Sequence, residues 1–414
     1  MLTVGEKIKQ IRKAKGYSQE NLAHDINVST STICRIEQGM AVVNGDILKT
    51  IKKALGVESA PLLPGEGEGF KERLYIWHKL ILDGHLVEAR TLQKGLSDIT
   101  ALPFESDLAT LYQLFDISLL LAEQNYAEAE ILLCNLNTNE MNQENQYHFY
   151  YNMGWVYMCI GEDRAKEPLD FLLKAYEIQE KPDGSLCYRI ARCLTRLGQP
   201  FSSMAMLDNA YKAYNDNKTT TTSLDLDNKM ALNCIDIGDT VRAKEILEKC
   251  LANARKISHE RYIAVILHNI GSAYAKEKNW ETAYDYFLEA DEYFNKTQSD
   301  FVNIYYKARC LVALRRFAQC KELLSQGLES ANEYYNVMFN SINHLITIRE
   351  YASHEYLETV TIPYLVNRYN ITDALDYCEI LEEFHENRGS TKKALELAKI
   401  QRDIYKRMIH SSFF

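Results

Sequence analysis

Apolar side chains recur every three or four residues along the first sixty residues, which is the period of an amphipathic helix. A first helix is predicted to begin after Thr3, whose side chain can pair with Glu6 in a reciprocal capping arrangement. Ser18 and Ser29 are predicted to cap a second and a third helix, which the short turn "NVS" joins. A fourth helix is predicted over about residues 46–55.

The third predicted helix has two different faces. Ile33 and Ile36 point toward a small core, so the opposite face is polar and nearly free of negative charge. That face and the first turn carry Thr30, Ser31, Cys34, Arg35 and Gln38. Two helices joined by a short turn, the second with a hydrogen-bonding outer face, form the geometry that places a helix in the major groove of DNA.

From about residue 70 onward the helical period continues without alternating strands, and a self-similar unit recurs. The copy "LHNIGSAYAKEKNWETAYDYFLEADEYF" has the spacing of the tetratricopeptide repeat, with Ile270, Gly271, Tyr274, Ala283, Phe287 and Ala290. Weaker copies give about nine units of roughly 36–40 residues, of which Pro363 interrupts the eighth. The predicted fold is therefore all-α: a helix-turn-helix head followed by a right-handed superhelix of about nine tetratricopeptide repeats.

Three segments follow from these patterns. Residues 1–60 form the head, residues 61–69 a linker, and residues 70–414 the repeat array. Proline and glycine concentrate around the linker, which predicts a hinge. Its "GEGEG" is not expected to bind phosphate, because Glu66 and Glu68 would repel the anion and no strand precedes the motif.

Charge is uneven along the chain, whose net charge is −10. The head has nine Lys or Arg against six Asp or Glu, whereas the remainder has 38 against 51. A weakly basic head on an acidic body is typical of a small nucleic-acid-binding module joined to a part that avoids polyanions. No apolar run is long enough to span a membrane and the start lacks the pattern of a secretion signal, which predicts a cytoplasmic protein.

Catalytic and metal-binding motifs are missing from the sequence. The ten cysteines include no C-x-x-C pair, which predicts reduced thiols and neither a disulfide framework nor a zinc site. No zinc-protease, serine-hydrolase or Walker sequence occurs. We therefore expect no cofactor, no metal and no conventional enzymatic activity.

Stacked helix pairs enclose an extended trough, lined by the first helix of each pair, which suits a short peptide. The repeat register places these residues on or beside that wall: Tyr151, Asn152, Trp155, Tyr188, Arg192, Asn228, His268, Asn269, Tyr305 and Arg309. Asparagine can bond both groups of a peptide backbone, and arginine can bind a carboxylate through two parallel bonds. The alternatives are that Asn152 and Asn269 serve packing and that the arginines pair with acidic side chains of the chain itself.

The head resembles the helix-turn-helix family of phage repressors and related bacterial regulators. The resemblance lies in "GYSQENLA" at residues 16–23 and "VSTSTICRIEQG" at residues 28–39. It implies that Gln19 holds a phosphate and that the third helix reads base edges, with a DNA-contacting set of Gln19, Ser29, Thr30, Ser31 and Arg35. The alternatives are that Arg35 only pairs with Glu37 or a phosphate and that the hydroxyls contact only the DNA backbone.

The combination of this head with a repeat array is similar to the peptide-responsive regulators of Gram-positive bacteria, the RRNPP family with NprR, PlcR and the Rap proteins. The resemblance implies a cytoplasmic receptor for an imported peptide. Because one small head contacts too few base pairs to find a site in a genome, we expect a homodimer, paired through its repeats, on a palindromic double-stranded DNA operator. A short secreted and re-imported oligopeptide would bind inner-wall asparagines and change DNA affinity. The alternatives are a Rap-like module that dephosphorylates or sequesters a response regulator, and a phage-borne regulator of lysis and lysogeny.

Overall fold

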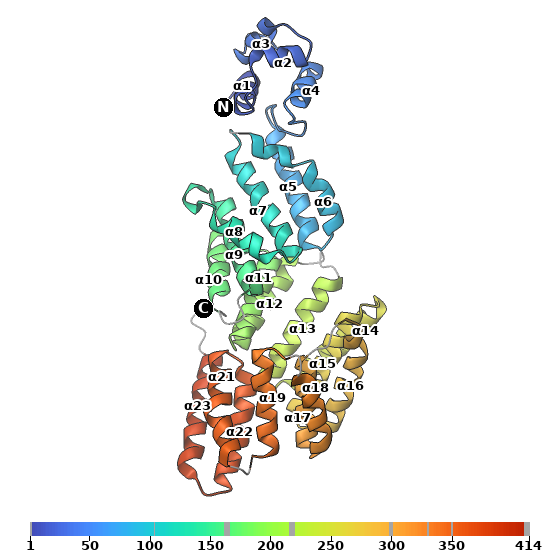
Figure 1. Cartoon of the computed structure of the whole chain (residues 1–414), viewed down its shortest axis with the longest axis vertical. Helices are drawn as coiled ribbons and strands as arrows, with labels where there is room; N and C mark the ends of the chain where they lie inside the picture. The colour runs from blue at the N-terminus through green and yellow to red at the C-terminus, as the bar shows by residue number, and fades with distance from the viewer. Residues whose placement is uncertain are drawn as a thin grey trace. The chain divides into compact units, whose positions relative to one another are not determined.

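The structure is a computed structural model that describes residues 2–102, 104–160, 166–214, 220–297, 301–328, 331–348 and 351–409. Every regular element in these ranges is helical, and no β-strand occurs among them (Figure 1). The chain divides into two compact units, Met1–Glu180 and Lys181–Phe414. Within the described ranges, no helix combines the length and apolar character that crossing a membrane requires.

The first unit begins with the four short helices of the head, α1 (Val4–Ala14), α2 (Gln19–Asp25), α3 (Thr30–Glu37) and α4 (Gly45–Ala54). Three helix pairs follow: α5 (Glu66–Leu82) with α6 (Leu86–Lys94), α7 (Ser106–Ala122) with α8 (Tyr126–Cys134), and α9 (Gln143–Ile160) with α10 (Glu167–Ile178). Two single turns of 3-10 helix lie between pairs, η1 (Ser97–Ala101) and η2 (Thr138–Glu140).

The second unit continues the array with α11 (Gly184–Arg196), α12 (Pro200–Tyr214), α13 (Thr220–Asp236), α14 (Thr240–Lys256), α15 (Glu260–Lys276), α16 (Trp280–Thr297), α17 (Phe301–Ala313), α18 (Phe317–Leu328) and α19 (Glu333–Ile346). The partner of α19 is broken into α20 (Tyr351–Tyr356), η4 (Leu357–Thr361) and α21 (Ile362–Asn367). The last pair is α22 (Ile371–Glu386) with α23 (Thr391–Ile409).

The broken helix is the one that the sequence predicts around Pro363. Proline has no backbone N–H, and its ring crowds the carbonyl four residues earlier, so a regular α-helix cannot continue through it. A π-helical turn, η4, precedes the short helix that contains the proline. The eighth repeat is therefore degenerate in the structure, as the sequence predicts.

The predicted caps of the head are present. Thr3 and Glu6 form the reciprocal capping box of α1, and Thr3 N donates to Glu6 Oε2 at 2.7 Å. The Ser18 hydroxyl accepts from Asn21 N at 3.0 Å, and the Ser29 hydroxyl accepts from Thr32 N at 3.1 Å. These bonds satisfy N–H groups that the first turn of a helix leaves without a partner.

Small residues allow the two helices of a pair to approach closely. A Cβ atom added to Gly271 would lie 2.7 Å from the ring of Phe287, and one added to Gly154 would lie 2.5 Å from the Leu172 side chain. Atoms this close would overlap, so the contact requires glycine. Gly271 is one of the residues of the tetratricopeptide spacing, and this contact explains why a small residue stands there.

The connection between the head and the first helix pair is packed, which corrects the predicted hinge. Residues 66–69 form the first turn of α5, and Pro61 and Leu62 are buried. One hydrophobic core runs from Ile8 in α1 to Leu119 in α7. Glycine and proline here serve a tight turn, and the side chains around them are apolar enough to join the core. The boundaries of the predicted head and array stay predictions.

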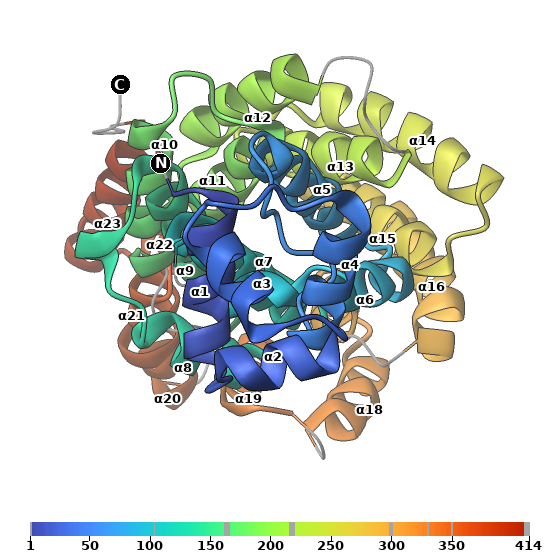
Figure 2. The ribbon, with the colours of Figure 1, turned by 90° about the horizontal axis from the view of Figure 1, so that it is seen from above.

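In the view from above, the helices of the second unit follow one another around a ring (Figure 2). Side chains of α22 contact those of α13 and α15, although these helices are far apart in the sequence. Thr372 Oγ1 on α22 donates to Asp236 Oδ1 on α13 at 2.9 Å, and Lys276 Nζ on α15 lies 3.4 Å from Asp376 Oδ1 on α22. The predicted class is confirmed: an all-α chain with a helix-turn-helix head followed by a superhelix of helical repeats.

Candidate functional site

The outer face of α3 is the first candidate site. Ile33 and Ile36 are buried, and the exposed residues on the other side are Thr30, Ser31, Arg35 and Gln38. The Ser29 side chain caps the helix and also bonds the Thr32 hydroxyl at 2.8 Å. The face therefore presents hydroxyl, amide and guanidinium groups, which are the groups that read base edges and phosphates.

A buried ion pair holds the C-terminal end of α3 in place. Arg12 Nε donates to Glu37 Oε1 at 2.5 Å, Arg12 Nη2 to Glu37 Oε2 at 3.0 Å, and Arg12 Nη1 to the Tyr17 carbonyl at 2.6 Å. Burial alone would raise the pKa of Glu37, but hydrogen bonds from Arg12 and Gln19 outweigh it and lower that pKa. The alternative in which Arg35 pairs with Glu37 is contradicted, because Glu37 is buried and bound elsewhere while Arg35 is exposed.

Gln19 has a structural bond as well as its predicted role. Its Nε2 donates to Glu37 Oε2 at 2.8 Å, which ties the first turn of α2 to the end of α3. An amide carries two N–H groups, so one remains for a phosphate. The phosphate contact stays a prediction. The Arg12–Glu37 pair, whose carboxylate orients this amide, is not apparent from the sequence alone.

In the first unit, the structure gives Asn152 a packing role, which corrects its prediction as a peptide contact. Asn152 is fully buried, its Nδ2 donates to the Leu114 carbonyl at 2.7 Å, and its Oδ1 accepts from the Ser118 hydroxyl at 2.9 Å. Both ends of the amide therefore serve the contact between α7 and α9. Tyr151 is corrected for the same reason, since it is 2% exposed and packs against Trp155.

Replacing Asn152 should destabilise the first unit. We expect Asn152→Ala to lower the free energy of unfolding of this unit by about 1–3 kcal/mol, because both buried hydrogen bonds of the amide, to the Leu114 carbonyl and from the Ser118 hydroxyl, are lost. Asn139→Ala, at an exposed position, is the matched control and should change it by less than about 0.5 kcal/mol. Hydrogen exchange of α7 and α9 measures the difference, and equal effects of the two substitutions would contradict this assignment.

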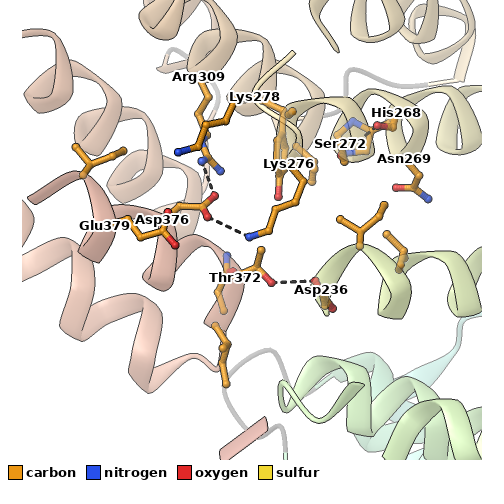
Figure 3. Close-up of a pocket in the computed structure, with 18 of the residues that line it drawn as sticks. Asp236, His268, Asn269, Ser272, Lys276, Lys278, Arg309, Thr372, Asp376 and Glu379 are labelled. Carbon is orange, nitrogen blue, oxygen red and sulfur yellow. Dashed lines mark hydrogen bonds and ion pairs between the residues drawn. The ribbon is translucent and has the colours of Figure 1, made fainter. Parts of the chain in front are cut away.

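The second candidate site is a pocket of about 1200 Å³ in the second unit. Its wall comes mainly from the first helices of successive pairs, α11, α13, α15 and α17, and from α22 (Figure 3). Three predicted groove residues line it: His268, Asn269 and Arg309. The volume exceeds the roughly 300–1,000 Å³ typical of small-molecule sites. The pocket therefore has room for a ligand larger than a single metabolite.

The other predicted groove residues of this unit lie elsewhere. Tyr305 is 2% exposed and its hydroxyl donates to the Tyr377 hydroxyl at 3.4 Å, so its prediction is corrected; its neighbour Tyr306 lines the pocket instead. Asn228 Oδ1 accepts from Asn269 Nδ2 at 2.7 Å. Three predicted residues of this unit neither line this pocket nor are fully buried, and their roles stay predictions: Tyr188, Arg192 and Asn228. The role of Trp155, in the first unit, also stays a prediction.

Charged groups from α15, α17 and α22 meet at one side of the pocket. Arg309 Nη1 donates to Asp373 Oδ1 at 2.8 Å. Its Nη2 donates to Asp376 Oδ2 at 2.6 Å (Figure 3). Lys276 adds a second cation beside Asp376. For Arg309 the structure thus confirms the alternative in which an arginine pairs with carboxylates of the chain itself. The acidic residues of α22 could not be predicted from the sequence, because no local signal brings the last repeat against the fourth to seventh.

Asp236 makes the stability of this unit depend on pH. Burial raises its pKa to about 6, against the Thr372 hydrogen bond and the two lysines, which lower it. The folded state therefore binds more protons than the unfolded state between about pH 4 and 6, and stability falls as pH rises through that window.

Asp236→Asn should remove this pH dependence. We expect the variant to be more stable than the parent by about 1–3 kcal/mol at pH 7.5 and to show no such gain at pH 4, because the amide is never charged. Urea unfolding at the two pH values measures it. Thr372→Val removes the hydrogen bond that lowers the pKa of Asp236, so this pKa should rise further. The fall in the stability of the variant with rising pH should therefore continue to a higher pH than in the parent. A gain that is the same at both pH values would refute the assignment.

Within the parts of the chain that the structure describes, no group of three or more His, Cys, Asp or Glu side chains could hold a metal ion. All ten cysteines fall in those parts and are free thiols.

Known proteins match most of the head. Residues 8–62 match the helix-turn-helix family. Over 63 residues the chain is 41% identical to the control protein C.BamHI of Bacillus amyloliquefaciens, a match that covers 15% of this chain and 78% of that protein. It is 39% identical over 57 residues to endothelial differentiation-related factor 1 of Homo sapiens, covering 14% of this chain and 38% of that protein's length. The chain belongs to the helix-turn-helix family.

Solved structures match the array. A Rap protein complexed with competence and sporulation factor aligns with a TM-score of 0.71 at 18% identity, over 83% of this chain and 99% of that one. NprR in complex with its cognate peptide NprX aligns with a TM-score of 0.66 at 18% identity, over 80% and 99%. At such identities the likeness shows the fold alone. The resemblance to the RRNPP regulators is therefore confirmed at the level of the fold.

Proposed function

We propose that this protein is a cytoplasmic transcriptional regulator that binds double-stranded DNA through its head and is controlled by a short peptide in the pocket of the second unit. The observation that carries the proposal is the large pocket on the inner side of the helix pairs, in the same chain as a helix-turn-helix head. Solved relatives of the array hold competence and sporulation factor or the peptide NprX, which supports a peptide as the ligand here.

The DNA-binding part of the proposal rests on α3. Thr30, Ser31 and Arg35 are exposed on one face, and Arg35 can bond the two acceptors of a guanine in the major groove. The N-termini of α2 and α3 and the second N–H of Gln19 would hold phosphates. A single small head contacts too few base pairs to select one genomic site, so two copies joined through their arrays would bind a palindromic operator.

Peptide control requires that the ligand bind two shapes of the array with different affinity. A hundredfold ratio would supply about 2.7 kcal/mol to shift the balance between them. The shared core of the head and α5–α7 supports transmission, because the head is packed on the first helix pairs and is not suspended from a loose linker. A change in the array would thereby change the spacing of two heads.

The full chain provides the test. Selection of bound sequences from random double-stranded DNA should yield a site with two-fold symmetry, and synthetic oligopeptides should bind the same protein by calorimetry and change its affinity for that site. Binding of peptide without any selected DNA, together with phosphate release from a phosphorylated response regulator, would favour the Rap-like alternative. Absence of both DNA and peptide binding would refute the proposal.

Arg35→Ala should weaken the selected site selectively. We expect a loss of about 1–3 kcal/mol, roughly tenfold to a hundredfold, with relaxed preference at one base position in each half-site. Lys49→Ala, at an exposed position of α4, is the control and should leave base preference unchanged. Fluorescence anisotropy with the site and its single-base variants measures both, and a uniform loss across all variants would assign Arg35 to a phosphate.

A further inference from the structure

The pocket of the second unit carries a charge opposite to that of its surroundings. Six Lys and Arg side chains line it against four Asp and Glu, although the chain beyond the head has 51 acidic residues against 38 basic ones. Lys278 and Arg315 are exposed lining residues at the turns after α15 and α17. A concave wall with excess positive charge attracts anions and raises their local concentration.

Deeper in the pocket, the chain provides its own anion to two of these cations. Asp376 lies between Lys276 and Arg309, with its Oδ2 accepting from Arg309 at 2.6 Å and its Oδ1 3.4 Å from Lys276 Nζ (Figure 3). The two cations come from α15 and α17, and the carboxylate comes from α22. Lys276 and Arg309 are therefore arranged to bind a carboxylate, and the Asp376 side chain occupies that position.

The two aspartates of this cluster differ in how firmly they are held. Asp373 has a side chain 4% exposed, bonds Arg309 and accepts from Asn370 Nδ2 at 2.8 Å near the start of α22. Asp376 has a side chain 21% exposed and lines the pocket, as Asp373 does not. Asp376 is therefore the carboxylate that an incoming anion can replace, while Asp373 continues to neutralise Arg309.

We propose that Lys276 and Arg309 bind a carboxylate of the peptide ligand, and that Asp376 occupies this subsite as an internal competitor until the ligand replaces it. The inference rests on the proposed peptide-binding function and names the chemistry of the ligand: a peptide with a free C-terminal carboxylate that reaches this side of the pocket. Replacement of Asp376 breaks ion pairs that tie α22 to α15 and α17, so ligand binding loosens one connection of the last helix pair.

Two synthetic heptapeptide libraries test the subsite with the full chain. Both contain the same random sequences of uncharged residues, with acetylated N-termini, and they differ in ending in a carboxylate or in an amide. Affinity selection read by mass spectrometry should retain the carboxylate library at least tenfold more strongly, because only its members can bond Lys276 and Arg309 as Asp376 does.

A variant then identifies the competitor. Asp376→Asn should bind the tightest selected carboxylate peptide about tenfold more strongly than the parent, whereas Glu386→Gln, on an exposed position of the same helix, should leave the affinity unchanged. Circular dichroism and the melting temperature check that both variants fold. Lys276→Met should weaken the same peptide by about tenfold.

The outcomes separate the two proposals. Equal retention of both libraries, or an unchanged affinity in Asp376→Asn, would overturn the subsite and leave a peptide receptor with another mode of recognition. Failure of both libraries to bind would refute the peptide-binding function itself, and the subsite with it.

Discussion

Arg12→Met should lower the free energy of unfolding of the head by about 3–5 kcal/mol. Arg12 and Glu37 are 6% and 3% exposed, and three hydrogen bonds from the guanidinium satisfy Glu37 and the Tyr17 carbonyl. Methionine keeps much of the volume but leaves the Glu37 carboxylate buried without its cation, and such an uncompensated charge is among the most costly changes in a protein interior. The bond from Gln19 compensates for a small part of this loss.

The loss of stability should come from the buried Glu37 carboxylate that has lost its cation, and not from the missing attraction between the two side chains. Arg12→Met combined with Glu37→Leu should therefore recover most of the stability, because replacing both members of a buried pair by apolar residues is often neutral. Lys13→Met, at the exposed neighbouring position, is the matched control and should cost less than about 0.5 kcal/mol. Hydrogen exchange of α1 and α3 measures the three variants. A double variant as unstable as the single one would contradict this account.

The same substitution connects stability to function. Glu37 and Gln19 join the ends of α3 and α2, so loss of Arg12 frees the helix whose outer face carries Arg35. DNA affinity should therefore fall in Arg12→Met although Arg12 itself is buried. It should return with stability in the double variant to the extent that α3 is again held in place.

Features with a local physical cause could be predicted from the sequence. Thr3, Ser18 and Ser29 cap helices because each hydroxyl accepts a bond from a backbone N–H only three residues away. The helix pairs follow from the 3.6-residue period, and Pro363 breaks its helix through its own ring. None of these depends on which distant segment packs nearby.

Positions that depend on a precise face or a distant partner could not be predicted equally well. Successive helical residues point about 100° apart, so a register uncertain by one residue exchanges Tyr305, which is buried, for Tyr306, which lines the pocket. Asn152 is a residue type that can bind a peptide backbone. Only the position of α7 shows that both ends of its amide already form hydrogen bonds within the protein. The bond between Thr372 and Asp236 spans 136 positions, and repeat periodicity alone gives no sign of it.

Phe287→Ala should be the most damaging single truncation beneath the pocket. Phe287 is fully buried in α16, and its ring lies 5.1 Å from the ring of His268 and 5.8 Å from that of Tyr306. Alanine would leave a cavity that the close backbone at Gly271 cannot fill without moving α15. We expect a loss of about 3–5 kcal/mol in the free energy of unfolding of the second unit.

Leu288→Ala is the matched control, because Leu288 is the next residue and is 43% exposed. It should cost well under half as much, since an exposed side chain leaves no enclosed cavity. Hydrogen exchange should show lost protection in α15–α17 and unchanged protection in α1–α4, where a separate core holds the head. His268 and Tyr306 line the pocket, so a peptide bound there should also dissociate faster from Phe287→Ala than from the control. Equal stability of the two variants would mean that the pair α15 and α16 does not depend on this ring, and that the pocket wall is supported from elsewhere.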